Sequence, residues 1–159
     1  MSNHILLRPA RLADLENINR VIEAAIMTWD LPERVKRLAL SSYRYTDNDF
    51  RFLHIIIAEH GENNIVGVAT WEQADKKYTP DNTHALLLHG IYVDPAHHHQ
   101  GIGQQLFTAT EEAARAHHFD SIVVKAQQGA EPFFIKQGMQ RLAVDNEKQQ
   151  YANRFWKKV

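Results

Sequence analysis

A glycine pair in the middle of the chain is the first feature that points to chemistry. Gly101 and Gly103 follow His98 in a short polar segment, which separates an apolar run at residues 85–93 from an amphipathic stretch that continues to about His117. The first N–H groups of a helix have no intrahelical partner, and the helix dipole adds partial positive charge there. Glycine lets a ligand approach the backbone without a Cβ in the way. The segment therefore predicts a phosphate or pyrophosphate site just after His98.

The elements that must hold this loop follow from the pattern on either side of it. Residues 85–93 predict a buried strand, which Asp94 and Pro95 end because proline cannot continue a central strand. Beyond the loop, the helical spacing of apolar residues predicts a helix. Its expected buried face carries Ile102, Leu106, Ala109 and Ala113.

The remaining chain predicts a mixed α/β sheet. Period-two and apolar runs predict strands at residues 5–9, 52–59, 65–71, 121–126, 139–144 and 151–156. Helical periodicity predicts helices from about Leu12 to Trp29, from Pro32 to about Tyr43, and over residues 129–137, with a hairpin turn at 60–64 and a loop at 47–49. An early antiparallel meander followed by crossover helices is typical of such a sheet.

The glycine segment resembles the coenzyme A loop of the GNAT superfamily of N-acetyltransferases. That family's pattern is Gln or Arg, x, x, Gly, x, Gly or Ala, and the spacing here is His98-x-x-Gly101-x-Gly103. His98 stands where Gln or Arg is usual, and His99 where a glycine is common. Because the family holds the pyrophosphate mostly through backbone amides of this loop, the resemblance tolerates both changes.

A second motif supports the same resemblance. Residues 130–139, AEPFFIKQGM, are similar to the family segment Ala-x-x-Phe-Tyr-x-Lys-x-Gly-Phe. With both motifs in the family's element order, the resemblance covers nearly the full chain. It implies one GNAT domain over residues 1–159, with a central mixed, mostly antiparallel sheet of about six to seven strands flanked by about four helices.

The resemblance implies that acetyl-CoA or another acyl-CoA is the donor and that an amine is the acceptor. In the family the central strand pairs with the pantetheine arm, and an amide near Ile91 would polarise the acetyl carbonyl as an oxyanion hole does. The cofactor-binding residues implied in this way are Ile91, Val93, His98, His99, Gln100, Gly101, Ile102, Gly103, Gln104, Gln127 and Phe134.

Catalysis needs a base, because a free alkylamine has a pKa near ~10.4 and arrives protonated. His89, on the central strand shortly before the pantetheine-binding positions, is the preferred candidate, and some family members also have a histidine there. Glu72, near the end of the third strand, is the alternative base. Each also fits an ordinary structural role, as a packed or solvated strand residue.

Two positions depart from the family where it handles the leaving thiol and the pantetheine arm. Phe134 stands where many members have a tyrosine, and a phenyl ring cannot donate a proton to the CoA thiolate. Water, another hydroxyl or unaided departure of the thiolate remain as alternatives. Gln127 stands where the family often has Asn, and its amide can still bond the pantetheine arm.

In the family, the acceptor site is walled by two connections, which correspond here to residues 27–33 and 145–150. Their carboxylates can attract a cationic amine, or they can be ordinary solvated acids: Asp30, Glu33, Asp145 and Glu147. Trp29 and Trp156 fit a core or interface position as well as a substrate platform.

Composition limits the other classes of function. The net charge is −1, so the chain lacks the general basic footprint of a nucleic-acid binder. It has no cysteine, which excludes disulfides, thiolate metal sites and a cysteine nucleophile. No apolar run reaches the ~20 residues of a membrane helix, and no signal-peptide pattern precedes the first strand, so a cytoplasmic protein is expected. The histidines at 97–99 and 117–118 predict no metal site, because no Asp or Glu is spaced to complete a ligand set.

The sequence therefore predicts an N-acetyltransferase that acts by direct attack of a primary amine on acetyl-CoA. The acceptor, a small molecule or a peptide or protein amine, is left open, as is homodimerisation. A non-catalytic acyl-CoA-binding sensor or regulatory module is the alternative, which Phe134 keeps open. A nucleotide-binding module is the third reading, and Gln104 argues against it because a Walker lysine is absent after Gly103.

Overall fold

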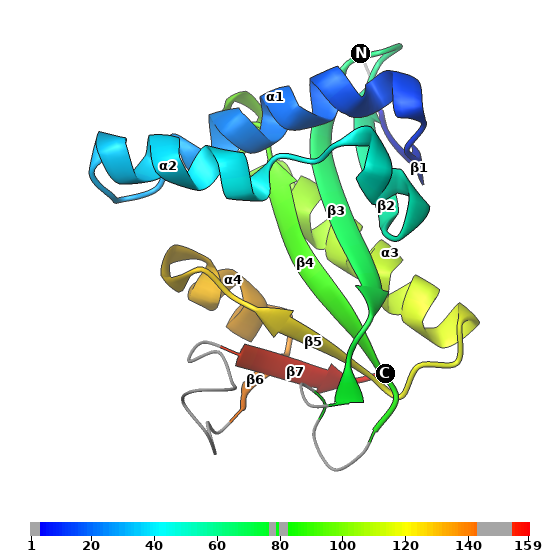
Figure 1. The fold of residues 1–159 in the computed structure, drawn as a ribbon. Helices are drawn as coiled ribbons and strands as arrows, with labels where there is room; N and C mark the ends of the chain where they lie inside the picture. Colours follow the sequence, from blue (N-terminus) through cyan, green and yellow to red (C-terminus); the bar gives the residue numbers. More distant parts are fainter. Residues whose placement is uncertain (1–3, 77–78, 80–82, 143–153) are drawn as a thin grey trace. The chain divides into compact units, whose positions relative to one another are not determined.

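The computed structural model describes residues 4–76, 79, 83–142 and 154–159 (Figure 1). Within these residues the strands are β1 (Ile5–Pro9), β2 (His54–His60), β3 (Ile65–Gln73), β4 (Ala85–Val93), β5 (Ser121–Lys125), β6 (Gln140–Arg141) and β7 (Arg154–Lys158). The α-helices are α1 (Leu15–Ile26), α2 (Glu33–Tyr43), α3 (Ile102–Ala116) and α4 (Glu131–Lys136). Short 3₁₀ turns are η1 (Leu12–Asp14), η2 (Asp47–Arg51), η5 (Pro95–His97) and η6 (Gln128–Ala130).

The strands form one seven-stranded sheet in the order β1-β2-β3-β4-β5-β7-β6 (Figure 1). β1 and β2, β5 and β7, and β6 and β7 pair antiparallel, whereas β4 and β5 pair parallel. A parallel pair needs a crossover connection, which α3 supplies. The predicted fold class, a mixed and mostly antiparallel sheet with four helices, is confirmed. No helix in the described ranges is long and apolar enough to cross a bilayer.

The chain separates into two compact units whose boundary passes through β3, β4 and α3. Unit 1 contains residues 1–70 and 91–106, and unit 2 contains residues 71–90 and 107–159. Each unit therefore combines segments that are distant in sequence. A single domain over the whole chain stays a prediction.

Unit 1 is built around the amphipathic helix α1. Its apolar side chains recur every three or four residues and are buried, as the sequence predicted. They pack with residues of β2, β3 and β4 into one core cluster, whose members include Ile18, Ile22, Ile57, Val68 and Tyr92. The predicted helix start at Leu12 is a single 3₁₀ turn, and α1 proper begins at Leu15.

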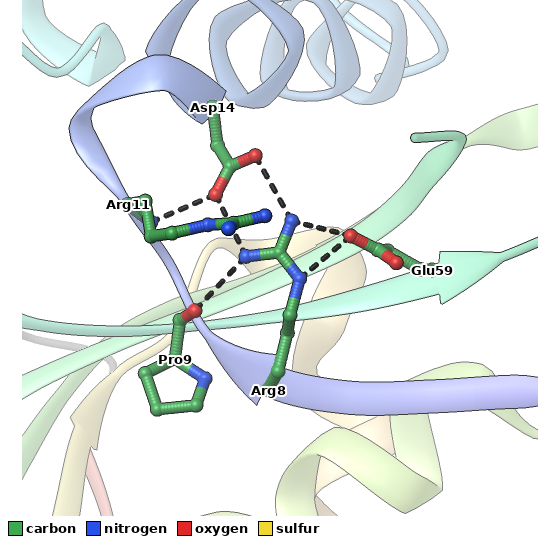
Figure 2. A network of polar contacts seen from close by, with 5 residues as sticks. All are labelled: Arg8, Pro9, Arg11, Asp14 and Glu59. Atoms are coloured by element: carbon green, nitrogen blue, oxygen red, sulfur yellow. Dashed lines mark hydrogen bonds and ion pairs between the residues drawn. The ribbon is translucent and has the colours of Figure 1, made fainter. Parts of the chain in front are cut away.

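A charged cluster ties β1, η1 and β2 together in unit 1 (Figure 2). The Arg8 guanidinium donates to both carboxylate oxygens of Asp14, at 2.9 and 3.0 Å, and its Nε donates to Glu59 Oε1 at 2.6 Å. Asp14 also accepts from the Arg11 N–H at 2.7 Å, which caps the first turn after β1. The hydrogen bond from Arg8 holds the pKa of Asp14 below its usual range, although burial opposes the shift. The same contacts raise the pKa of Arg8.

The connections before and after β2 show one correct and one wrong prediction. The predicted turn at 60–64 is confirmed: the His60 N–H donates to the Asn64 carbonyl at 2.8 Å, and Gly61 and Asn63 have positive φ angles of 76° and 59°. The predicted loop at 47–49 is instead the 3₁₀ turn η2. Its cause is local, because Asp49 accepts from the Thr46 N–H at 2.7 Å and so stabilises a helical turn.

In unit 2, β5 and β7 pair antiparallel beside a small apolar cluster of Ala74, Ala85, Leu87 and Val123. The predicted helix at 129–137 is η6 followed by α4, and Gly138 ends it with a φ of 88°, as expected for a helix C-terminus. The final strands are shorter or shifted relative to the prediction, with β6 covering only Gln140 and Arg141. The predicted strand ends at Val144 and Tyr151 lie outside the described residues.

The buried face of α3 differs from the predicted one. Ile102 and Leu106 are buried as expected, but Ala109 and Ala113 are partly exposed. The other fully buried residues of the helix are Phe107, Thr110 and Ala114. A spacing of four from Ile102 reaches residues 106, 110 and 114, so the buried stripe of this helix follows an i, i+4 pattern. The predicted positions Ala109 and Ala113 lie one residue away from this stripe, at its edge.

Candidate functional site

The turn that leaves β4 is shaped by one aspartate. Asp94 Oδ1 accepts a hydrogen bond from the Ala96 N–H at 3.0 Å, and the Asp94 carbonyl accepts from the His97 N–H at 2.8 Å. Pro95 fits the first position of the resulting turn η5, because its missing N–H would have no partner there. The chain thus turns off the strand immediately before the glycine segment.

Two residues of the glycine segment adopt left-handed backbone angles. His99 has a φ of 63° and Gly101 a φ of 77°. This conformation is free for glycine, but it costs a residue with a Cβ roughly 1–2 kcal/mol. A Cβ on Gly101 would meet no atom within 4 Å, so the backbone angle rather than space calls for glycine at this position.

The segment presents backbone and polar side chains to solvent at the start of α3. His98, His99, Gln100 and Gln104 are exposed, whereas Ile102 is 1% exposed and anchors the first turn in the core of unit 1. The Gln105 N–H donates to the Gly101 carbonyl at 3.0 Å, so the N–H groups before it precede the intrahelical ladder. An exposed helix start of this kind can accept a phosphate group.

A glycine in β3 brings α3 close to the sheet. A Cβ on Gly67 would lie 2.9 Å from Ile102 Cγ2 and 2.9 Å from Leu106 Cδ1. Both distances are shorter than real Cβ contacts allow, so any other residue here would force the Ile102 and Leu106 side chains, or α3 itself, to shift. Gly67 therefore sets the position of the helix start that follows the loop.

An ion pair anchors the same loop to the rest of unit 1. Arg20 of α1 lies 3.5 Å from Asp94 Oδ2 and donates to the Ile65 carbonyl at 3.2 Å. The Asp94 N–H donates to the Val66 carbonyl at 2.8 Å. Sequence reasoning missed Arg20, since nothing local to an exposed position on α1 reveals a partner 74 residues away. Asp94 before Pro95 did carry a signal, as a turn-forming pair.

The strand β4 extends beyond the end of its parallel partner β5. Its pairing with β5 covers Ala85–Leu88 opposite Ser121–Val124, and β5 ends at Lys125, whereas β4 continues to Val93. From His89 onward, β4 has no ladder partner in β5. The backbone groups at Ile91 and Val93 are the ones for which the sequence predicted pairing with pantetheine.

His89 and Glu72, the two candidate bases, are bonded to each other. His89 Nε2 lies 2.9 Å from Glu72 Oε2. Their side chains are 36% and 39% exposed, so both are half-open to solvent. Both residues belong to unit 2, and His89 is the first residue of β4 beyond its pairing with β5. The sequence named the two side chains as alternatives and missed that they form a pair.

Phe134 is a buried core residue of unit 2. It is 4% exposed, and its ring makes edge contacts with Phe107 and Phe133 at centroid distances of 6.5 and 5.2 Å. Tyr92, the hydroxyl-bearing residue of β4, packs in the core of unit 1, where burial raises its pKa, with smaller contributions from Tyr45 and Tyr43. Tyr92 is therefore a core residue whose hydroxyl keeps its proton.

Gln127 uses part of its amide locally. Its Oε1 accepts from the Gly129 N–H at 2.8 Å, which stabilises the turn leading into α4. This contact does not use the amide nitrogen, which can donate a hydrogen bond to a ligand. The predicted role of Gln127 toward pantetheine stays a prediction.

The predicted acceptor walls are only partly described. Asp30 and Glu33 are exposed, and Glu33 forms an i, i+4 pair with Arg37 at 2.8 Å, whose hydrogen bond lowers its pKa. Asp145 and Glu147 lie outside the described residues. Trp29 contacts Tyr43 edge-on at a centroid distance of 5.4 Å beside the core of unit 1.

The histidines near the loop make ring contacts with one another. His97 lies 5.2 Å from His60 and His98 lies 6.1 Å from His99, measured between ring centroids. Across the part of the chain that the structure describes, no group of three or more His, Cys, Asp or Glu side chains is arranged to hold a metal ion.

Taken together, the fold and the loop define an α/β protein in which a helix start of the phosphate-binding kind follows the strand that parts from its parallel neighbour. The family model for the acetyltransferase (GNAT) family matches residues 22–139. The chain therefore belongs to the GNAT family of acetyl-CoA-dependent N-acetyltransferases. A search of curated proteins found no match.

Solved structures share this fold over nearly the whole chain. A PaiA N-acetyltransferase from Thermoplasma acidophilum, in complex with coenzyme A, is 13% identical with a TM-score of 0.78 over 98% of this chain and 99% of its own. A GCN5-related N-acetyltransferase from Rhodopseudomonas palustris is 24% identical with a TM-score of 0.72, over 97% and 95%. A GNAT family acetyltransferase from Brucella melitensis, in complex with acetyl-CoA, is 18% identical with a TM-score of 0.64, over 87% and 84%. At these identities the likeness establishes the fold.

Proposed function

We propose that this protein transfers an acetyl group from acetyl-CoA to a primary amine by direct attack in a ternary complex. The observation that carries the proposal is the segment from His98 to Gln104, exposed except at Ile102 and Gly103, in which left-handed backbone at Gly101 leads directly into the start of α3. The neighbouring structures from Thermoplasma acidophilum and Brucella melitensis contain coenzyme A and acetyl-CoA, which supports this choice of donor.

The pyrophosphate of the cofactor would bind at this helix start. Charge-assisted hydrogen bonds contribute roughly 1.5–3 kcal/mol each, so a few of them suffice for the about −8 kcal/mol of a micromolar complex. The pantetheine arm would pair with β4 at Ile91 and Val93, where that strand is no longer paired with β5. An N–H near Ile91 would then polarise the acetyl carbonyl.

His89 is proposed as the base that deprotonates the amine. Imidazole side chains commonly serve as general bases, and the His89 ring is exposed enough to receive a proton from a bound acceptor. It lies two residues before Ile91 on the same strand. The absence of cysteine from the sequence removes the covalent route through a thiol, which leaves direct attack.

Calorimetric titration with acetyl-CoA, beside CoA and ATP as controls, tests the donor. The expected result is micromolar binding of both CoA species and no heat from ATP. Absence of binding to either CoA species would refute the proposal. The second candidate is an acyl-CoA sensor, which is favoured by a buried Phe134 at the position where a tyrosine could donate a proton. Binding without turnover of any amine, with acetyl-CoA affinity unchanged in His89→Gln, would support this candidate.

A further inference from the structure

We infer that Glu72 is a positioning residue that fixes the tautomer of His89, so that the two side chains act as one base. The inference rests on the proposed acetyl transfer and deepens it. It begins from the 2.9 Å contact between His89 Nε2 and Glu72 Oε2. An ionised carboxylate has no proton to give, so the hydrogen of this bond belongs to the imidazole Nε2.

This bond leaves the other ring nitrogen ready for catalysis. In a neutral imidazole only one nitrogen carries hydrogen, so protonation at Nε2 makes Nδ1 the proton acceptor. A base within hydrogen-bond reach of the amine must present an unprotonated nitrogen, and a carboxylate behind it prevents the ring from adopting the wrong tautomer. Glu72 thereby holds both the orientation and the protonation state of His89.

The location of the pair fits this role. The pairing of β4 with β5 stops at Leu88, so His89 is the first residue of β4 that is not paired with β5. Glu72 belongs to β3, which neighbours β4 on the side opposite to β5. Neither side chain is needed for the core, because both are more than a third exposed. A half-exposed polar contact of this kind stabilises a fold only weakly, so stability is a poor explanation for the arrangement.

Acetyl transfer through this pair conserves protons and electrons at every step. The acceptor ammonium gives one proton to His89 Nδ1, and the freed nitrogen lone pair attacks the thioester carbonyl carbon. The carbon–sulfur bond breaks, and its electron pair leaves on the sulfur of CoA. The amide nitrogen loses its second proton to solvent, and the thiolate takes one proton from the imidazolium. Glu72 remains ionised throughout and stabilises the positive charge on the ring.

The test uses the full chain with Glu72→Met, His89→Gln and the double variant, and Glu23→Met as matched control. Methionine keeps the length of glutamate but accepts no hydrogen bond. Glu23 is a similarly exposed carboxylate, 46% exposed and 3.0 Å from Arg44, and it belongs to α1 in unit 1. Because the chain has no cysteine, a thiol-reactive dye detects only released CoA. The amine probes are 1,5-diaminopentane, tyramine, and peptides with a free alanyl N-terminus or a lysine.

Kinetics gives the first readout. A general base contributes typically 10²–10⁴-fold, so we expect His89→Gln to lower kcat by about 10²-fold and Glu72→Met by at least about tenfold. The KM for acetyl-CoA should stay within about twofold in both variants. Since residues that act as a unit are non-additive, the double variant should be no slower than His89→Gln alone. Glu23→Met should match the wild type.

The ¹⁵N NMR spectrum of histidine-labelled protein gives a second readout that does not depend on an acceptor. The His89 ring, assigned by its absence in His89→Gln, should carry hydrogen on Nε2 in the wild type and lose this preference in Glu72→Met. Unchanged kcat or an unchanged tautomer in Glu72→Met would overturn the role of Glu72 and leave acetyl transfer intact. Failure of the wild type to bind acetyl-CoA or to acetylate any amine would instead refute the proposed function, and this inference with it.

Discussion

Replacing Arg8 by methionine should strand two carboxylates in a largely dry part of unit 1. Figure 2 shows Arg8 as the shared partner of Asp14 and Glu59. The three side chains are only 18%, 12% and 11% exposed. Removing one partner of a buried ion pair costs roughly 3–5 kcal/mol, because the remaining charge is left uncompensated. We expect the Arg8→Met variant to fall at the lower end, about 3 kcal/mol, since these carboxylates keep some contact with water.

The pH dependence gives the prediction its sign. In the wild type the pKa of Asp14 is lowered by Arg8, so its contribution to stability is present above the ordinary carboxyl pKa of about 4 and is lost as pH falls through the folded value. In Arg8→Met the largest cause of this lowering is gone, and burial, which disfavours the charged form, is opposed only by the contacts of Asp14 with Arg11. Asp14 of the variant then takes up its proton at a higher pH than Asp14 of the wild type, so the deficit should shrink as the pH falls from about 7 toward the ordinary carboxyl pKa of about 4.

Urea unfolding of both proteins, followed by circular dichroism across this pH range, measures the deficit. Arg44→Met serves as the control, because Arg44 and Glu23 are about half exposed and such pairs contribute roughly 0–1 kcal/mol. A companion variant that also carries Asp14→Asn and Glu59→Gln should recover most of the loss, since no buried charge remains. A deficit below about 1 kcal/mol at neutral pH, or one that widens in acid, would refute the reasoning.

Three further predictions concern the loop and its supports. Gly101→Ala should cost roughly 1–2 kcal/mol of stability, because φ is 77° there, and should weaken acetyl-CoA binding in calorimetry; unchanged affinity would contradict the role of the loop. Gly67→Ala should cost roughly 1–3 kcal/mol in urea unfolding, because its Cβ would lie 2.9 Å from Ile102 Cγ2, and an unchanged midpoint would show that α3 shifts freely. Phe134→Tyr should leave kcat within about twofold, because the ring is 4% exposed, and a tenfold gain would instead identify thiolate protonation as limiting.

Much of the fold was predictable because its signals are local. The strand at 85–93 was predicted with its observed bounds, since a mostly apolar run ends at Asp94 and Pro95. The turn at 60–64 and the end of the helix at 129–137 were predicted from equally local signals, and Gly61 and Gly138 relieve backbone strain there. The loop at 47–49 was wrong because a single side chain, Asp49, closes a helical turn that composition alone does not reveal.

The candidate site was less predictable, because its essential relations are long-range. Both His89 and Glu72 could be named from their residue types, but their contact depends on the register between β3 and β4. The support that Arg20 gives to Asp94 likewise joins α1 to a turn far along the chain. Such pairings are set by tertiary packing, which periodicity within one element does not encode.

The left-handed backbone of His99 has a consequence for how such loops are recognised. Its φ of 63° is the angle that a glycine would take without strain, although the residue is a histidine. A search pattern written in amino-acid letters rejects this loop at two positions, His98 and His99. A pattern written in dihedral angles would accept the left-handed conformation at His99 without regard to its side chain. In this chain the loop has the backbone conformation of the motif at His99, although the residue there differs from the glycine that the motif commonly has.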